Sequence, residues 1–385
     1  MSFDEDIFED QEPIEESSEL GLSESSFSDL LVAPADWTIG TLHSQIGKQI
    51  DLDPEFQRRN VWSRIAKSRF IESLMLGIPI PQILLSSKAG QKNVYLVLDG
   101  KQRLLALKEF LEDGFKLKDL RVIHELENKN WSHISQLPTW SDRLLNETQR
   151  TAVIRNWKSE EVLYEIFYRL NSGSVRLSPM ELRMSLHPGP FLKFIIKWTE
   201  NVGPIHELLR KKQPDPRMND VELAVRFLGF KINKVTYNGD LKDFLDKTCI
   251  ELNSEFDEDE NAHSKILAEL NNLNNAVSSG IHIFGEKHFC RKYIHGNYES
   301  RFNRAAFDVL VGALSNSDIL EAAMAQPSAF EEAYIEASQD SRFINAIETT
   351  TKSVESTRNR FEIFYSKVSE RFGIQAQIPN IRQAQ

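Results

Sequence analysis

The sequence contains only two cysteines, Cys249 and Cys290, among its 385 residues. Two cysteines in so long a chain cannot provide the disulfide framework of a small secreted domain. No run of about 18 apolar residues is present, so we expect no transmembrane helix. Residues 1–30 contain no lysine or arginine, and the N-terminus therefore lacks the basic start of a signal peptide. We expect a cytoplasmic protein without a membrane partner.

The negative charge is concentrated at the N-terminus. Residues 1–30 hold eleven acidic residues, and the whole chain has a net charge of −11. Subtracting these eleven from the 57 acidic residues leaves 46, which equals the number of lysines and arginines. The neutral remainder can carry basic patches, so nucleic acid is not excluded as a partner. Residues 1–33 are expected to form a disordered acidic tail, either a solvated spacer or a segment that occupies a basic groove when nucleic acid is absent.

The length of the chain predicts more than one folded unit, because a domain usually holds about 100–200 residues. Strand and helix patterns alternate in residues 34–145, whereas residues 146–385 have mainly helical patterns. The predicted fold class is therefore α+β. It consists of an α/β domain at 34–145 and a helical domain at 146–385.

The pattern within residues 34–145 predicts a compact α/β element. Ser63 is placed to cap a helix that Gly77 ends. Residues 94–98 form a near-continuous apolar run, which is typical of a strand covered on both faces. The expected elements are a short strand or turn at 39–42, a helix at 63–76, strands at 82–86 and 94–98, and a helix at 101–112. Farther along, the acidic residues 253–261 are expected to form an exposed loop.

The segment from Asp99 to Arg103 lies where a strand meets the N-terminus of a helix. The first turn of a helix has unpaired N–H groups and attracts anions. Gly100 allows close approach to a phosphate, Arg103 can hold two phosphate oxygens, and Lys101 and Gln102 add donors. Asp99 can hold a divalent cation or orient a water molecule. An ordinary strand-ending turn with solvated side chains would explain the same residues.

A second basic cluster precedes the helix at 63–76. Gln57, Arg58 and Trp62 belong to a stretch, Gln-Arg-Arg-Asn-Val-Trp, that combines arginines, amides and an aromatic ring. These groups can bind phosphate and stack a base, and Lys67 and Arg69 extend the positive charge. A tryptophan at this place is also a common core residue. Two basic clusters around one α/β element favour anion binding more than either does alone.

Several motifs in order resemble the GmrSD restriction endonuclease N-terminal domain family. The motifs are Gln57-Arg58-x-x-Val61-Trp62, Gly77-Ile78-Pro79-Ile80-Pro81 and Leu98-Asp99-Gly100-Lys101-Gln102-Arg103-Leu104. The family signature is usually Asp-Gly-Gln-Gln-Arg, and Lys101 stands here in place of the first glutamine. Leu170-Asn171-Ser172-Gly173 with Ser178-x-x-Glu181-Leu182-Arg183 resembles a second motif. Arg217-Met218-x-Asp220-x-Glu222-Leu223 resembles a third, so the resemblance spans roughly residues 37–310.

The resemblance implies a ParB/sulfiredoxin-like fold for the N-terminal part and nucleotide binding, with hydrolysis in some members. Members occur in prokaryotic systems that restrict foreign, often modified, DNA. The implied ligands are a nucleoside triphosphate and a divalent cation such as Mg²⁺, and the implied partners are DNA and a nuclease or modification protein. By position, the implied nucleotide site consists of Gln57, Arg58, Gly100, Lys101, Gln102 and Arg103. Asp99 and Arg103 are the catalytic candidates, Asp99 is the metal candidate, and Asn171, Glu181 and Arg183 would approach from the helical lobe.

The sequence departs from the family in lacking a recognisable nuclease. Many members carry a C-terminal His-Asn-His metal site, and no such arrangement follows here. His282, His288, Cys290 and His295 are close in sequence, but their spacing is poor for a zinc site. Asp215 and Glu222 lack the Glu-x-Lys expected of a common restriction-nuclease core, and no Walker A loop is present.

Two main functions remain open from the sequence. One is a divalent-cation-dependent NTPase whose hydrolysis controls action on foreign DNA. The other is a ParB-like module that senses nucleotide or DNA without turnover and recruits a partner effector. A weak nuclease that uses the same Asp99–Arg103 loop is a third possibility.

Overall fold

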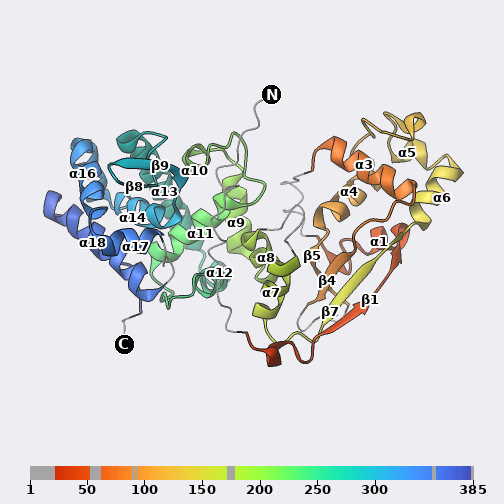
Figure 1. Ribbon diagram of the computed structural model, residues 1–385, viewed down its shortest axis with the longest axis horizontal. Coiled ribbons are helices and arrows are strands. Elements are labelled where there is room, and N and C mark those ends of the chain that lie inside the picture. Colours follow the sequence, from red (N-terminus) through yellow and green to blue (C-terminus); the bar gives the residue numbers. More distant parts are fainter. Residues whose placement is uncertain are drawn as a thin grey trace. The chain divides into compact units, whose positions relative to one another are not determined.

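The structure is a computed structural model that describes residues 22–52, 62–88, 91, 93–170, 178–348 and 353–382. Its chain divides into two compact units, Glu19–Leu186 and His187–Gln385, called here the N-terminal unit and the C-terminal unit (Figure 1). The N-terminal unit combines a mixed sheet with helices, and the C-terminal unit is mainly helical. The predicted α+β class is thereby confirmed.

A mixed five-stranded sheet organises the N-terminal unit. In spatial order its strands are β1 (Leu31–Pro34), β7 (Thr151–Arg155), β4 (Ile83–Ser87), β5 (Tyr95–Asp99) and β3 (Ile50–Asp51). Strand β5 is antiparallel to β4 and parallel to β3, and β4 is parallel to β7. Asp99 pairs with Leu84, so the carboxyl end of β5 lies beside the amino end of β4. A separate pair is formed by β2 (Trp37–Thr38) and β6 (Thr148–Gln149).

Both faces of the sheet are covered, as the apolar run at 94–98 predicts. Side chains alternate along a strand, and Ile83 and Leu85 therefore join one core while Leu84 joins another. The first core is built with α1 (Ile39–Gln45), α3 (Arg64–Met75), α4 (Lys101–Leu111), α5 (Trp131–Ile134) and α6 (Pro138–Asn146). The second is built with α7 (Glu160–Leu170) and α8 (Pro179–Leu186). The sheet is a buried central layer.

The expected helix start at Ser63 is confirmed, and the expected strand or turn at 39–42 is wrong. The Ser63 side chain accepts a hydrogen bond from the Ala66 amide, and α3 then runs to Met75. Residues 39–45 form α1 instead of a strand, because the Thr38 side chain caps it by accepting from the Thr41 amide. Ile39 and Leu42, three positions apart, are buried on one face of this helix.

The sheet takes in residues on either side of the predicted α/β domain. Residues 31–33 of the expected tail belong to β1, which pairs with β7, while residues 1–21 lie outside the described part. Strand β7 follows residue 145, yet it lies between β1 and β4. The division between units therefore comes after Leu186 and differs from the boundary expected at 145. Helical patterns at 160–186 gave no sign that α7 and α8 cover the sheet.

The C-terminal unit is a bundle with one hairpin. Helix α11 (Asn219–Ile232), buried at every residue from Asp220 to Phe230, packs against α9 (Pro190–Thr199), α12 (Leu241–Glu258), α13 (Ala262–Phe284) and α14 (Arg304–Leu314). The hairpin is formed by β8 (Arg291–Ile294) and β9 (Asn297–Phe302). The other helices are α10 (Pro204–Leu208), α15 (Ser317–Ala325), α16 (Pro327–Ala337), α17 (Ser341–Glu348) and α18 (Val354–Phe372).

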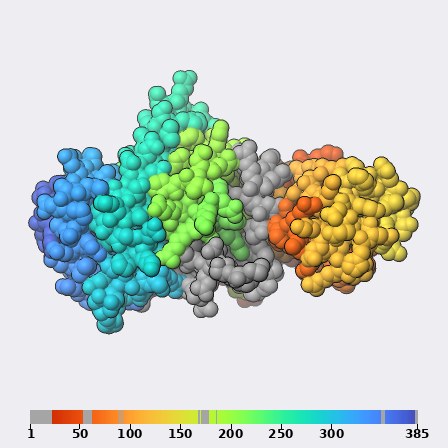
Figure 2. Space-filling model, turned by 90° about the horizontal axis from the view of Figure 1, so that it is seen from above, coloured from red at the N-terminus to blue at the C-terminus, as the bar shows by residue number. Residues whose placement is uncertain are grey.

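The acidic residues expected to form a loop at 253–261 are helical as far as Glu258. Cys249, Leu252 and Phe256 lie at helical spacing on the buried face of α12, so the acidic side chains between them can remain in solvent. Figure 2 shows the region that joins α12 to α13 projecting from the surface of the C-terminal unit. The charge run was a poor sign of a loop because the apolar residues determine the helix.

A buried charged cluster joins three helices of the C-terminal unit. Asp308 on α14 accepts from Arg226 Nε at 2.5 Å and from Arg360 Nη2 at 2.8 Å. All three side chains are at most 1% exposed. Buried charges are tolerated only when they are paired and hydrogen-bonded, and this carboxylate therefore links α11, α14 and α18.

No helix within the described ranges is long and apolar enough to cross a bilayer.

Removing the carboxylate of this cluster should destabilise the C-terminal unit. Asp308→Ala leaves two guanidinium groups buried without their shared acceptor, a change that typically costs about 3–5 kcal/mol. Urea unfolding followed by circular dichroism would measure the loss, with the exposed Asp257→Ala as the matched control. A loss below about 1 kcal/mol would show that the cluster does not hold the helices together.

Acid should weaken the N-terminal unit through Glu72. This buried carboxylate on α3 accepts from the amides of Arg121, Val122 and Ile123 at 2.8–3.1 Å. Burial alone would raise the pKa of Glu72, but the amide donors prevail and lower it below the ordinary value of 4.5. A lowered folded-state pKa contributes stability above the unfolded-state pKa, and that stability is lost as the pH falls through the folded-state pKa.

Glu72→Gln should therefore reduce stability at pH 7 and make it depend less on pH below about 4.5. Five of the six tryptophans lie in the N-terminal unit, so tryptophan fluorescence during urea unfolding reports mainly on it. Glu112→Gln, an exposed change in the same unit, serves as the control. An unchanged pH profile in the Glu72 variant would contradict the assignment.

Candidate functional site

The candidate site begins at the turn between β5 and α4. Gly100 has φ +95° and ψ 11° and occupies the N-cap of α4, a left-handed conformation that other residues rarely adopt. A Cβ atom at Gly100 would lie 2.9 Å from Ile83 Cγ1 and 3.1 Å from Arg103 Nη2. Gly100 is buried. Packing within the turn therefore requires a glycine at this position, whether or not a ligand approaches.

Arg103 holds the turn to the chain that precedes β4. Its guanidinium donates to Asp99 Oδ2 at 2.8 Å, to the Pro81 carbonyl, and to the Gln82 carbonyl at 3.4 Å. Burial lowers the pKa of Arg103, while the charge of Asp99 and its hydrogen bond oppose that shift. An arginine stays protonated in proteins, so this is an ion pair with Asp99. The guanidinium expected to face phosphate therefore contacts protein acceptors in this conformation.

Lys101 links the Leu98–Leu104 motif to the motif that contains Glu181. Its ammonium group lies 3.9 Å from Glu181 Oε1, and both side chains are less than one-tenth exposed. Glu181 belongs to the predicted start of α8, where its carboxylate accepts from the Ser178 amide and its own amide donates to the Ser178 hydroxyl. The structure thus joins two motifs some eighty positions apart. Arg183, in the same motif, is fully buried and donates to Met180 Sδ.

Gln102 connects the turn to Trp62, the last residue of the Gln57–Trp62 basic cluster. The Trp62 amide donates to Gln102 Oε1 at 3.3 Å. Gln57 and Arg58 lie outside the described residues, as does Asn171. Leu52, just after β3, is the last described residue before the gap. Strand β3 is parallel to β5 and therefore runs toward the end of the strands at which β5 reaches Asp99. The described chain resumes at Trp62, whose amide contacts Gln102 in the first turn of α4.

The expected positive surface on α3 is neutralised by ion pairs. Lys67 Nζ lies 2.5 Å from Glu109, and Arg69 Nη2 lies 2.5 Å from Asp119. Trp62 packs against the main core and makes an edge contact with Phe70, with ring centroids 5.5 Å apart. Lys67 and Trp62 take part in the packing of α3, whereas the Arg69 side chain stays 39% exposed. The expectation that Lys67 and Arg69 extend a phosphate-binding surface stays a prediction.

The remaining motif residues lie in the C-terminal unit. Asp220 is fully buried and pairs with His206 at 3.0 Å, and Glu222 pairs with Arg304 at 3.1 Å. The His288 ring stacks on Tyr298, and burial raises the pKa of the Cys290 thiol. Within the described ranges no three His, Cys, Asp or Glu side chains form a group that could hold a metal ion. These residues serve the structure of the bundle.

Two features of the site were missed by reasoning from sequence. The acceptors for Arg103 are backbone carbonyls of Pro81 and Gln82, and side-chain patterns give no information about which carbonyls a turn exposes. The ion pair between Lys101 and Glu181 was also not predicted from the sequence. A buried lysine opposite a buried glutamate becomes visible only when α8 is known to cover the sheet face beside β5.

Gly100→Ala should disturb the turn more than a matched glycine change. A left-handed conformation costs an alanine about 1–2 kcal/mol, and the clash with Ile83 adds about 1–3 kcal/mol. Gly47 is the control, because it has φ +78° and a Cβ there would meet nothing within 4 Å. Urea unfolding followed by tryptophan fluorescence should show a loss at least about 1 kcal/mol larger for Gly100→Ala than for Gly47→Ala. Equal losses would show that the turn has room for a side chain.

Comparison with known proteins identifies the family of the N-terminal part. Residues 39–188 match the family model of the GmrSD restriction endonuclease, N-terminal domain. No curated protein and no solved structure matched the chain. The match includes the Asp99–Arg103 turn and the motif of α8, and it ends before the third motif at 217–223. The resemblance expected from the motifs is thereby confirmed: residues 39–188 match the GmrSD restriction endonuclease N-terminal domain family, which indicates a component of a restriction or defence system.

Proposed function

We propose that the turn at the start of α4 binds the polyphosphate of a nucleoside triphosphate, in a protein that acts against foreign or modified DNA. One observation carries the proposal. Trp62, the first described residue after Gln57 and Arg58, donates its amide to Gln102 in the first turn of α4, and Lys101 pairs there with Glu181 of the second motif. An arginine-bearing segment beside the first turn of a helix provides the charges and N–H donors that phosphate requires.

The residues of the turn take different parts in this proposal. The backbone amides of Gln102 and Arg103, in the first turn of α4, donate to phosphate oxygens. Lys101 and Arg58 supply positive charge, and Gln57 adds a donor. Arg103 is a positioning residue, because its guanidinium fixes Asp99 and the chain at Pro81. Asn171 and Glu181 close the site from the side of α8.

The residues present fit one magnesium ion shared with the ligand. Asp99 Oδ2 is engaged by Arg103, and its other carboxylate oxygen can serve as a ligand. The described residues offer no group of three metal ligands, but Mg²⁺ commonly binds through one or two carboxylates together with substrate phosphates and water. When bound, the ion would neutralise charge on the phosphates.

Hydrolysis in this site would rest on positioning and charge. The oxygen of a water molecule attacks the γ-phosphorus, the bond to the bridging oxygen breaks, and the nucleoside diphosphate leaves. One proton of the water passes to an oxygen of the phosphate that is released. Asp99 orients the water, while Lys101 and Arg58 stabilise the charge that develops on the transferred group. In this proposal the hydrolysis controls a partner nuclease or modification protein that acts on DNA.

A non-catalytic nucleotide sensor is the second candidate function. The observation that favours it is the pairing of Asp99 with Arg103 at 2.8 Å, which occupies the carboxylate that hydrolysis needs. Such a module would bind nucleotide or DNA and recruit a partner effector without turnover.

The decisive measurement combines binding and turnover on the full chain. Titration calorimetry with ATP, GTP, CTP and UTP in magnesium should detect at least one nucleotide, and Arg58→Ala should weaken it by about tenfold or more through the lost charge-assisted bonds. Arg155→Ala, an exposed change at the end of β7 and at the opposite end of the strands from Asp99, is the matched control. Wild-type phosphate release with and without DNA should be lost in Asp99→Ala.

The outcomes separate the candidates. Binding without phosphate release above background leaves the sensor and removes the NTPase. Absence of binding for all four nucleotides removes both. Plasmid nicking that Asp99→Ala abolishes would instead indicate a nuclease that uses this loop.

A further inference from the structure

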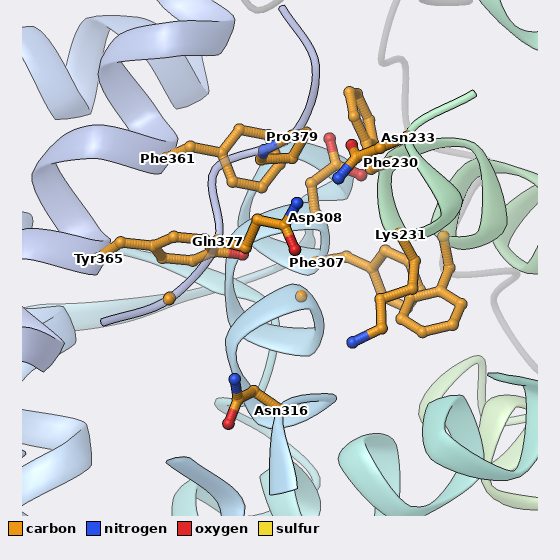
Figure 3. A pocket seen from close by; sticks show the side chains of 13 residues that line it. Phe230, Lys231, Asn233, Phe307, Asp308, Asn316, Phe361, Tyr365, Gln377 and Pro379 are labelled. Atoms are coloured by element: carbon orange, nitrogen blue, oxygen red, sulfur yellow. The ribbon is translucent and has the colours of Figure 1, made fainter. Parts of the chain in front are cut away.

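A cavity lies within the C-terminal unit between α11, α14, α18 and the chain that follows α18. Its volume is about 640 Å³, including the part open to solvent. Figure 3 shows Phe361 and Tyr365 entering it from one side and Lys231 from the other, with Phe307 between them. The part of it that a water-sized molecule can occupy is about 100 Å³. Small-molecule sites usually have aromatic walls with a few polar groups, and this cavity has such a lining.

Lys231 brings an uncompensated positive charge to the cavity. Its ammonium group donates to the Ser315 carbonyl at 3.2 Å and to the Ser315 hydroxyl at 3.1 Å, and both acceptors are neutral. Across the described part of the chain, no carboxylate lies within ion-pair distance of it. The one carboxylate in the cavity wall, Asp308, already accepts from Arg226 and Arg360. The cavity therefore favours an anion.

Tyr365 presents a polar group to this space. Its side chain is 5% exposed, and its hydroxyl makes no hydrogen bond with any described residue. Burial raises the pKa of Tyr365, and the charge of Asp308 raises it further. The hydroxyl therefore stays protonated and can donate a hydrogen bond. A Cβ atom at Gly312 would lie 2.5 Å from this hydroxyl oxygen, so the glycine is what admits it. Because the hydroxyl has no hydrogen-bond partner among the described residues and Tyr365 lines the cavity, it can donate to a bound ligand.

A polar hollow adjoins the aromatic cavity and shares Lys231 and Asn316 with it. Its other lining side chains include the amides of Asn272 and Asn275 and the hydroxyl of Ser317. The hollow is open to solvent, so it can take a bulky anionic group while a flat ring remains inside. Aromatic walls lie on one side of Lys231 and a polar hollow lies on the other. Such an arrangement fits an amphipathic ligand.

The wall formed by residues 376–379 is held in place by specific bonds. The Asn380 amide donates to Asn233 at 2.9 Å, and its side-chain amide donates to Thr236 at 2.8 Å. Arg358 donates to the carbonyls of Ile381 and Arg382. The space is consequently enclosed by anchored chain and is not a gap under a loose end.

We propose that this cavity binds a small planar aromatic ligand that carries an anionic group. Its ring lies among Phe230, Phe307, Phe361 and Tyr365, and its anion is held by Lys231 at the polar hollow. The proposal is independent of the function proposed for α4, because all of its residues belong to the C-terminal unit.

The test uses matched pairs of charged and uncharged probes on the full chain. The probes are the four ribonucleoside 5′-monophosphates with their nucleosides, and naphthalene-2-carboxylate with naphthalene-2-carboxamide. Titration calorimetry should show at least one anionic probe binding at least about tenfold more tightly than its uncharged counterpart. Lys231→Gln should remove that preference, and Ala376→Phe, which fills the cavity from its wall, should weaken both members of the pair.

Two controls make the result specific. Lys234→Gln removes a nearby positive charge outside the cavity, and Asp99→Ala alters the α4 turn, and both should bind the probes as wild type does. Failure of every anionic probe to bind wild type overturns the proposal, as does binding that neither Lys231→Gln nor Ala376→Phe changes. Binding lost in Asp99→Ala would assign the probes to the other site and also overturn it. If Lys231→Gln does not fold by circular dichroism, Ala376→Phe decides.

Discussion

The left-handed backbone of Gly100 is the constraint on which the candidate site depends. It turns the chain from β5 into α4 within one residue, and its missing Cβ leaves room for the Arg103 guanidinium to return to Asp99. That return fixes the chain at Pro81 and Gln82, which leads into β4. The end of one strand and the beginning of its neighbour are thereby locked at the point where α4 presents its N-terminal amides.

This geometry changes what the arginine of the family signature does. A guanidinium with three protein acceptors organises the turn before any ligand arrives, and a preorganised turn loses less conformational freedom on binding. In the proposed site the positive charge for a ligand then comes from Arg58, while Lys101 shares its ammonium group with Glu181. In the C-terminal unit Asp308 has a comparable part, because one carboxylate compensates two arginines and leaves Lys231 as the charge facing the cavity.

The sequence was informative where local chemistry decides the structure. Ser63 and Ser178 begin helices because their hydroxyls cap them, and the apolar run at 94–98 forms a strand because two helical layers can cover it. It was uninformative where distant segments meet. Nothing local shows that β7 inserts between β1 and β4. Nor does the local sequence show that Lys67 and Arg69 on α3 form ion pairs with Glu109 and Asp119. The motif residues were found by their order, but which of them face a ligand depends on the packing of α8 and on backbone carbonyls.

The position of β1 bears on the acidic N-terminal residues. Leu31 pairs with Arg155, at the opposite end of the strands from Asp99, and two strands, β7 and β4, lie between β1 and β5. Eleven carboxylates thus precede a strand whose entry point faces away from the α4 turn. At that end of the strands Asp29, two residues before β1, lies 3.1 Å from Lys158, so its negative charge is compensated at a distance from the proposed phosphate site.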